Sequence, residues 1–280
     1  YEQIPSLVLG QRWTPQLNSR NMMKVVLCVW IEPYIENDLS FCVWPVHTPT
    51  TSKEVLTLSA STSPLPYTGN KSCIVNTILS VMPKHTVYID PCMGSAKVFF
   101  RKPRAEKEIL NDYNGDLVNL FRVIQNNEKL AYLLGRLYLS INGELAFKQN
   151  KDRLKGVPNI LDDVIETSQI FYDASWEDIQ NAAAFLENQV YSFSSTGQTF
   201  GIARRDMSQR LPRLMSAYNR IRDAIILHRD YKDVITYAAC PGSFILLDPP
   251  YKGTEDMYSK AVWPFPLPLE TINYLTGNLS

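Results

Sequence analysis

The sequence predicts an α/β fold built on a parallel sheet, and two features carry that prediction. Short apolar runs alternate with stretches of helical spacing, as strands and helices alternate in α/β proteins. Three of the four predicted strands end in an acidic residue or lead into one, namely Asp90, Asp112 and Asp248. Because α/β sheets bind ligands outside the carboxyl ends of their strands, we expect these carboxylates to face one crevice.

Each element follows from local spacing. The predicted strands are apolar runs at residues 87–89, 108–110, 224–227 and 243–247. Apolar residues recur with helical spacing at 71–81, at 117–124 and over most of 128–222. Residues 1–63 have no sustained period and contain a stretch rich in Thr, Ser and Pro, so we predict a poorly ordered N-terminal arm.

The composition excludes several classes of protein. The chain has 280 residues, 45% of them apolar, and its 28 Lys+Arg balance 28 Asp+Glu, which is typical of a globular domain and not of a disordered one. Its 5 cysteines and 3 histidines are widely spaced, so neither a disulfide framework nor a zinc pair is predicted. The apolar run at residues 25–31 is too short to cross a membrane. A polyanionic partner would have to bind a local basic patch.

Two strings follow the first two predicted strands. In Asp90-Pro91-Cys92-Met93-Gly94-Ser95-Ala96, the glycine permits a tight turn and a close approach of the backbone to a ligand. In Asn111-Asp112-Tyr113-Asn114, the acid stands where nucleotide-binding folds accept hydrogen bonds from ribose hydroxyls. The alternatives are an ordinary turn for the first string and a helix N-cap for the second.

The most specific string is Asp248-Pro249-Pro250-Tyr251, directly after the fourth predicted strand. The two prolines fix two φ angles and remove two donors, which leaves rigid carbonyl groups beside a carboxylate and an aromatic ring. A turn between a strand and a helix is the alternative, but it would need neither the acid nor the ring. The string therefore predicts a binding site.

Taken in order, these strings and Tyr67-Thr68-Gly69-Asn70-Lys71 resemble a Dam-type (D12 class) DNA adenine-N6 methyltransferase of bacteria and phages. The resemblance covers about residues 64–260 and implies a Rossmann-like sheet that binds S-adenosylmethionine, with an inserted, mainly helical target-recognition domain. The implied parts are the N-terminal arm (1–63), the cofactor-binding half (64–127), the target-recognition insertion (128–222), the catalytic half (223–262) and an irregular tail (263–280).

The resemblance also implies roles for single residues. Asp248 and the carbonyl of Pro249 would accept hydrogen bonds from the adenine amine, and Tyr251 would stack on the base once it has flipped out of the duplex. No metal is needed. The implied catalytic residues are Asp248, Pro249, Pro250 and Tyr251. The implied cofactor-binding residues are Tyr67, Gly69, Asn70, Lys71, Asp90, Pro91, Gly94, Ser95, Asp112 and Asp230.

A basic segment is expected to meet duplex DNA. Between residues 200 and 230, arginines outnumber acids by 4 in a chain of zero net charge. Arginine side chains can hold phosphates without reading sequence, although a solvated helix face with salt bridges is the alternative. The polar loop at 192–201 resembles the loop that approaches the flipped base in relatives. The predicted DNA-binding residues are Arg204, Arg205, Arg210, Arg213, Ser195, Thr196 and Gln198.

The chain departs from the family pattern at Cys92, at Lys97 and in its C-terminal residues. Prolines at alternate positions in 263–268 exclude both a helix interior and a central strand. We therefore expect a C-terminally truncated or altered sequence that lacks the last strands of the family, with the strand before Asp248 left as an exposed edge.

The predicted function is site-specific methylation of adenine N6 in DNA. The resemblance implies a monomer in the cytoplasm of a bacterium or phage-infected cell, with no membrane as a partner. A cognate restriction endonuclease is a candidate partner. Two alternatives are an RNA guanine-N2 methyltransferase, whose motifs normally lie closer together, and a non-catalytic remnant that binds DNA or cofactor. A generic nucleotide-binding domain would leave residues 248–251 without a role.

Overall fold

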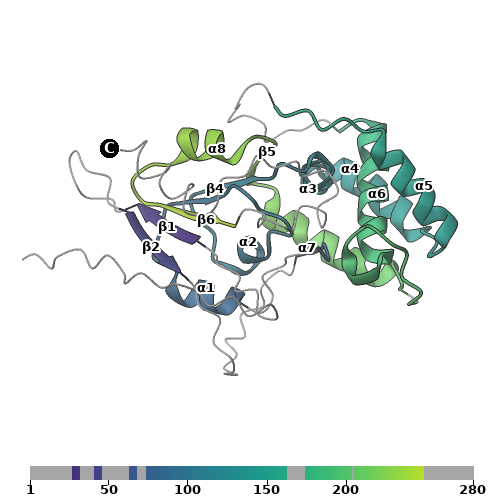
Figure 1. Ribbon diagram of the computed structural model, residues 1–280, viewed down its shortest axis with the longest axis horizontal. Coiled ribbons are helices and arrows are strands. Elements are labelled where there is room, and N and C mark those ends of the chain that lie inside the picture. The colour runs from purple at the N-terminus through teal and green to yellow at the C-terminus, as the bar shows by residue number, and fades with distance from the viewer. Residues whose placement is uncertain are drawn as a thin grey trace, which may run out of the picture.

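The computed structural model describes residues 63–67, 74–162, 174–203 and 205–248, and the backbone of two further strands at 27–31 and 41–45. Six strands form one sheet in the order β2-β1-β6-β3-β4-β5 (Figure 1). Strands β6, β3, β4 and β5 are parallel neighbours, which confirms the predicted parallel sheet. The strands are β1 (Leu27–Ile31), β2 (Phe41–Pro45), β3 (Val87–Asp90), β4 (Lys107–Asn111), β5 (Ile225–Leu227) and β6 (Ser243–Leu247).

The segment predicted as a poorly ordered arm contains two strands. β1 pairs with β2 and also with β6, in both cases antiparallel, and Leu27 lies opposite Leu247. The exposed edge that we expected beside Asp248 is therefore wrong, because β1 covers the edge of β6. A run as short as 25–31 has no period that separates a strand from other structure, and its pairing partner lies more than 200 residues further along the chain. Residues 249–280, including the tail, lie outside the described residues.

Helices cover both faces of the sheet and extend beyond one end of it. Figure 1 shows α8 above the sheet, α1 and α2 below it, and α4, α5 and α6 grouped to one side. None of the described helices is both long and apolar enough to cross a lipid bilayer. The helices are α1 (Val75–Val81), α2 (Lys97–Arg101), α3 (Gly115–Gln125), α4 (Asn127–Tyr138), α5 (Glu144–Lys155), α6 (Trp176–Tyr191), α7 (Leu211–Ile221) and α8 (Tyr231–Ala238), with short 3-10 turns η2 (Phe193–Ser195) and η3 (Ser208–Arg210).

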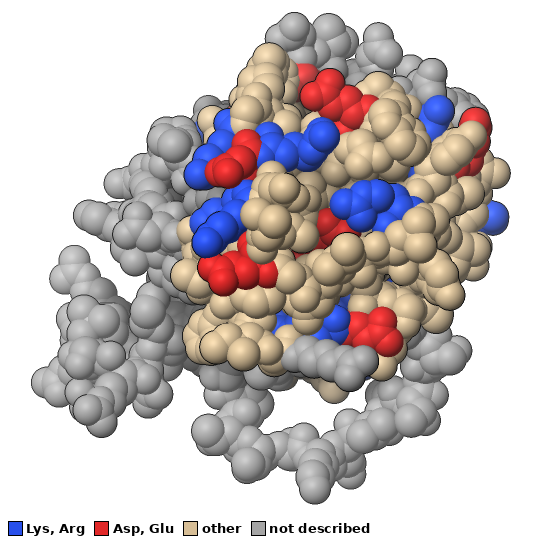
Figure 2. All heavy atoms as spheres, turned by 90° about the vertical axis from the view of Figure 1, so that its right-hand side faces the viewer, with Lys and Arg blue, Asp and Glu red and all other residues tan. Residues whose placement is uncertain are grey.

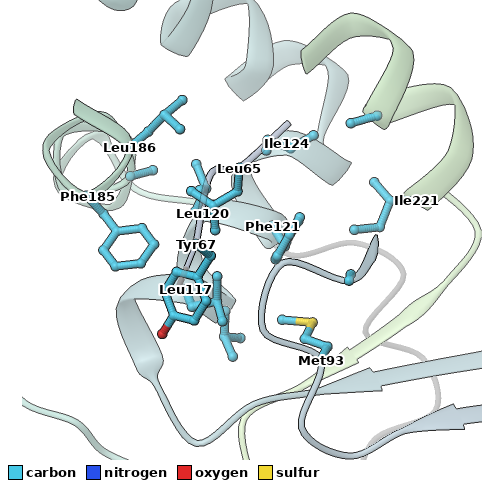
Figure 3. Close-up of a cluster of buried hydrophobic side chains, with 14 of the residues drawn as sticks. Leu65, Tyr67, Met93, Leu117, Leu120, Phe121, Ile124, Phe185, Leu186 and Ile221 are labelled. Carbon is cyan, nitrogen blue, oxygen red and sulfur yellow. The ribbon is translucent and has the colours of Figure 1, made fainter. Parts of the chain in front are cut away.

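Alternate residues of the strands pack into two cores, as a half-turn per residue requires. Ile89, Ile109 and Ile245 point to the α8 side, where they meet Val234 and Ile235. The intervening residues of the same strands point to the other face and join the larger cluster. That cluster includes Leu117, Leu120, Phe121 and Ile124 from α3, Phe185 and Leu186 from α6 and Ile221 from α7 (Figure 3).

Helix α6 connects the helical group of α4, α5 and α6 to this larger core. Its start is a capping box, in which the Ser175 side chain accepts from the backbone N–H of Asp178 and the Asp178 carboxylate accepts from the backbone N–H of Ser175. From Ile179 to Tyr191 nearly every residue is buried, because α3, α4 and α5 all pack against it. The helical group thus shares its core with the sheet. The predicted boundaries of the insertion stay a prediction.

Candidate active site

The carboxyl ends of the four parallel strands meet at one edge of the sheet. Asp90 ends β3, Asp112 follows β4, Asp230 lies three residues after β5 and Asp248 follows β6. Ile89 pairs with Ile245, so β3 and β6 are adjacent parallel strands whose carboxyl ends lie at the same edge. Asp248 and the turn that contains Gly94 therefore follow two neighbouring strands.

The turn after β3 is tight and is held by β4. Gly94 has φ +49° and Ala96 has φ +52°, a left-handed conformation that glycine adopts without strain. The backbone N–H of Met93 donates to the carbonyl of Asn111 at 2.8 Å, and a Cβ on Gly94 would lie 3.7 Å from the ring of Tyr67. Tyr67 therefore packs against this turn.

Asp112 connects the two turns. Its Oδ2 accepts from the backbone N–H of Gly94 and its Oδ1 accepts from that of Asn114, both at 2.9 Å. Burial raises the pKa of Asp112 to about 6, although the hydrogen bonds from Asn114 and Gly94 act in the opposite direction. Each carboxylate oxygen has two lone pairs, so Asp112 can still accept hydrogen bonds from a ligand.

Asp90 is almost fully buried, and Tyr88 orients it. The hydroxyl of Tyr88 donates to Oδ2 of Asp90 at 3.0 Å, and Asp90 is only 2% exposed. The ring of Tyr88 stacks on Phe244, and the ammonium of Lys102 lies 4.5 Å from its centroid. The Asp90 carboxylate is therefore held in one position beneath the edge. Ser95 is also buried.

Sequence reasoning missed Asn111 as a residue that shapes this edge. Its Nδ2 donates to the carbonyls of Pro91 at 2.8 Å and Arg229 at 2.9 Å, and its Oδ1 accepts from the backbone N–H of Arg229 at 2.9 Å. The side chain is completely buried. One amide thus joins the turns after β3 and β5. A polar residue at the end of an apolar strand was the signal that could have indicated it.

The segment after α5 contacts the turn that follows β4. Asn159 accepts from the backbone N–H of Gly115 at 2.7 Å and donates to the carbonyl of Tyr113 at 2.9 Å. His228 approaches the same carbonyl with Nε2 at 3.2 Å, and burial lowers the pKa of His228. Asp230 caps α8 by accepting from the backbone N–H of Lys232 at 2.9 Å. Asn159 and His228 thus hold the turn after β4, and Asp230 holds the first turn of α8.

Three of the predicted DNA-binding arginines converge. Arg205, Arg210 and Arg213 line a cavity of about 420 Å³ together with Asp206 and Gln209. Burial lowers the pKa of Arg210, and the neighbouring charges of Arg213 and Arg205 lower it further. Among the described residues, no carboxylate forms a salt bridge with any of these three arginines. Arg205 also donates to the carbonyls of Val190 and Ser192. With three arginines and one acid in its lining, the cavity has an excess of positive charge that suits an anion.

Other arginines of the same segment are engaged within the protein. Arg220 donates to both carboxylate oxygens of Glu108, at 2.5 and 2.7 Å, and Arg222 lies 3.5 Å from the carboxylate of Asp223. Figure 2 shows that basic and acidic side chains alternate over the end of the molecule formed by the helical group. Positive charge is thus local, as the zero net charge of the chain requires.

The polar loop at 192–201 is compact. The backbone N–H of Gly197 donates to Oγ of Ser192 at 2.9 Å, Oγ1 of Thr196 donates to the carbonyl of Phe193 at 3.1 Å, and Lys151 donates to the carbonyl of Gln198 at 2.7 Å. Ser195 has φ +56°. Gln198 is exposed, whereas Ser195 and Thr196 are half-buried.

Several predicted site residues lie outside the described residues. They include the prolines and the tyrosine that follow Asp248 and part of the segment after Tyr67. Their positions stay predictions. They are Gly69, Asn70, Lys71, Pro249, Pro250, Tyr251 and Arg204.

Comparison with known families agrees with the geometry of this edge. A model of the D12 class N6 adenine-specific DNA methyltransferases matches residues 67–267. The chain belongs to this family. The match runs from Tyr67 across the Gly94 turn, the helical group and β6, so the elements that form the edge are those of a DNA adenine methyltransferase. No curated protein matches the chain.

Proposed function

We propose that this D12-family protein transfers a methyl group from S-adenosylmethionine to N6 of an adenine flipped out of duplex DNA, at a specific site. One observation carries the proposal. The pairing of β6 with β3 brings Asp248 to the edge at which Gly94 and Asp112 lie. The carboxylate proposed to accept from the amine and the turn proposed to admit the cofactor thus follow two neighbouring strands.

The acceptor groups at the edge fit this cofactor. Carboxylates at 90, 112 and 248 suit hydroxyl donors and a cationic sulfur. When bound, S-adenosylmethionine supplies a methyl group on a sulfonium. Asp112 would hold the ribose hydroxyls, and the Gly94 turn with Tyr67 would line the methionine end.

Asp248 is the proposed catalytic residue. Its carboxylate would accept a hydrogen bond from the adenine amine, and the carbonyl of Pro249 would accept a second one. Two acceptors placed in this way favour a localised lone pair on the nitrogen and orient it. Tyr251 would stack on the extruded base, and Pro250 would keep the string rigid.

The activity is tested by incubation with methyl-labelled cofactor and mixed-sequence duplex DNA. We expect label in adenine N6 with the parent protein and a loss of about 100-fold or more with Asp248→Asn, since one acceptor of the amine becomes a poorer one. Asp223→Asn changes an exposed acid and serves as the matched control. Thermal unfolding shows that each variant is folded. Label in ribosomal RNA in place of DNA, or cofactor binding without transfer, would contradict the proposal.

The arginine cavity is proposed to bind phosphates of the DNA. Each phosphate contact contributes about 0.9 to the slope of log K against log salt, so Arg210→Ala and Arg213→Ala should each reduce that slope by about 0.9. Arg104→Ala is the control, because Arg104 is paired with Asp223 at 3.1 Å. A slope that is equal in all four proteins would remove the cavity from the DNA interface.

A further inference from the structure

A second cavity adjoins the arginine cavity. Its volume is about 580 Å³, and small-molecule sites usually measure about 300–1,000 Å³. Arg205 and Asp206 line both cavities. Tyr191, which lines the second one, lies close enough to Arg210 in the first to interact with it electrostatically. The two spaces are therefore neighbours. We call the second one the aromatic cavity, and its walls include Tyr138, Ser140, Gly143, Tyr191, Phe200 and Ile202.

The apolar side chains of the aromatic cavity are available to a flat ligand. Tyr138 is 70% exposed and Ile202 is 98% exposed, so neither is used by the protein core. Phe200 is half-buried, and its ring lies 5.8 Å from that of Phe147. Nucleobases stack on aromatic side chains whatever their sequence, because every base has a π-face. These walls therefore suit a nucleobase.

Two hydroxyl groups of the aromatic cavity can bind the edge of a base. Oγ of Ser140 and the hydroxyl of Tyr191 lie 2.9 Å apart and form one hydrogen bond. Each hydroxyl carries one proton and two acceptor lone pairs, so the pair keeps one proton to donate and has lone pairs left to accept with. Tyr191 is only 3% exposed, which fixes its position. Base edges present donors and acceptors of this kind.

The arginine cavity supplies the complementary charge next to these walls. Among the described residues, no carboxylate forms a salt bridge with Arg210 or Arg213. Arg205 is held at the boundary of the two cavities, because it donates to the carbonyls of Val190 and Ser192. A nucleotide carries an anionic phosphate and a flat base, joined by a sugar. The two cavities present cations and a stacking wall side by side.

We propose that the two cavities together bind one nucleotide, with its phosphate at Arg210 and Arg213 and its base in the aromatic cavity. The inference rests on the proposed binding of phosphate by the arginine cavity and adds a site for a base. It is a site separate from the edge of the sheet, since Gly94, Asp112 and Asp248 line neither cavity. Two sources share this chemistry: a nucleotide of bound DNA that is unstacked from the duplex, and a free nucleoside monophosphate.

The test uses thymidine 5′-monophosphate, thymidine and inorganic phosphate as separate probes, with calorimetry on the full chain. Thymidine lacks the purine of S-adenosylmethionine and the amine that Asp248 would hold, so these probes do not report on the edge of the sheet. Because stacking of one base contributes about tenfold or more to affinity, we expect the monophosphate to bind about tenfold more tightly than phosphate.

Substitutions separate the two cavities. Gly143→Phe should weaken binding of the monophosphate and of thymidine about tenfold and leave phosphate unchanged. Gly143 has φ −148°, and a Cβ there would meet only the side chain of Ile141, at 3.7 Å, so the larger residue can be accommodated. Gly135→Phe is the matched control, because a Cβ on Gly135 meets nothing within 4 Å and the residue lines neither cavity. Arg213→Ala should weaken the monophosphate and phosphate and leave thymidine unchanged.

A second variant of the aromatic cavity guards against a failure of Gly143→Phe to fold. Tyr191→Phe keeps the ring and removes the hydroxyl, and it should weaken thymidine but not phosphate. The inference is overturned if the monophosphate binds no more tightly than phosphate, or if neither substitution in the aromatic cavity changes its affinity. If phosphate itself does not bind, the proposed role of the arginine cavity is wrong and the inference fails with it.

Two duplexes of the same sequence, one of them with a single unpaired thymidine, identify the source of the nucleotide. If DNA supplies it, the parent protein binds the duplex with the unpaired thymidine more tightly, and Gly143→Phe abolishes the difference. If a free nucleotide is the ligand, the monophosphate binds as expected and the two duplexes bind equally. Both results support the site.

Discussion

Replacing Asn111 by Ala should destabilise the fold and weaken cofactor binding together. The substitution removes three buried hydrogen bonds, to the carbonyls of Pro91 and Arg229 and from the N–H of Arg229, at 2.8 to 2.9 Å. Each such bond contributes about 1 kcal/mol net, so the free energy of unfolding should fall by about 3 kcal/mol. For a chain of this size that corresponds to a decrease in Tm of about 6–12 °C.

Urea unfolding measures the first effect and calorimetry with S-adenosylhomocysteine the second. Asn119→Ala is a suitable comparison, because Asn119 lies on α3 and makes one side-chain hydrogen bond, to the carbonyl of Asp178 at 2.8 Å. Its loss should be about 1 kcal/mol, with no change in affinity. The ratio of the two losses in the free energy of unfolding is the quantity to compare, because the contribution of a single hydrogen bond varies with its surroundings.

The reasoning would be refuted if the two variants lost the same stability and kept the same affinity. The turn after β3 would then be held by backbone contacts alone. The N–H of Met93, which donates to the carbonyl of Asn111 at 2.8 Å, survives the substitution and could serve that purpose. An effect on stability without one on affinity would mean that the edge tolerates movement of the Arg229 backbone.

Two further predictions concern buried carboxylates. Glu108→Gln should cost about 3–5 kcal/mol in urea unfolding, because it leaves the buried cations of Lys102 and Arg220 without their carboxylate; Glu144→Gln, in an exposed pair with Lys148, should show no measurable change. Cofactor affinity should fall as the pH is lowered through about 6, the pKa to which burial raises Asp112, because the ionised carboxylate is the stronger acceptor for hydroxyls. Asp112→Asn should make the affinity independent of pH in that range, and a parent protein with a flat profile would contradict this role of Asp112.

The positions of the strand-end acids could be predicted because each depends on local sequence. A run of apolar residues followed by an acid specifies the end of a strand, whatever the strand pairs with. The order of the strands could not be obtained in that way. β1 and β6 are neighbours although more than 200 residues separate them, and no periodicity in a run of seven residues encodes such a partner. The covered edge of β6 was missed for this reason.

In the basic segment, the helical spacing of the apolar residues could have shown which arginines face inward. The buried residues of α7 are Leu214, Ala217, Arg220 and Ile221, at spacings of three, three and one. Helical periodicity thus places Arg220 on the face that packs inward, where it meets Glu108. Arg213 lies off that face, in agreement with its place in the arginine cavity. The sign of a charge cannot by itself separate an arginine that holds a phosphate from one that holds a buried carboxylate.

The end of α3 explains how two distant halves of the chain can build one edge. Nε2 of Gln125 donates to the carbonyls of Ile221 at 3.1 Å and Ala224 at 2.6 Å, and Arg122 donates to the carbonyl of Ile226 at 3.0 Å. The chain therefore leaves the sheet after α3 and returns to β5 at nearly the same place. Segments whose ends lie close together can be inserted with little effect on the surrounding fold, and the entropy of loop closure grows only slowly with length. Asp112 and Asp248 can for this reason reach the same edge although 136 residues separate them.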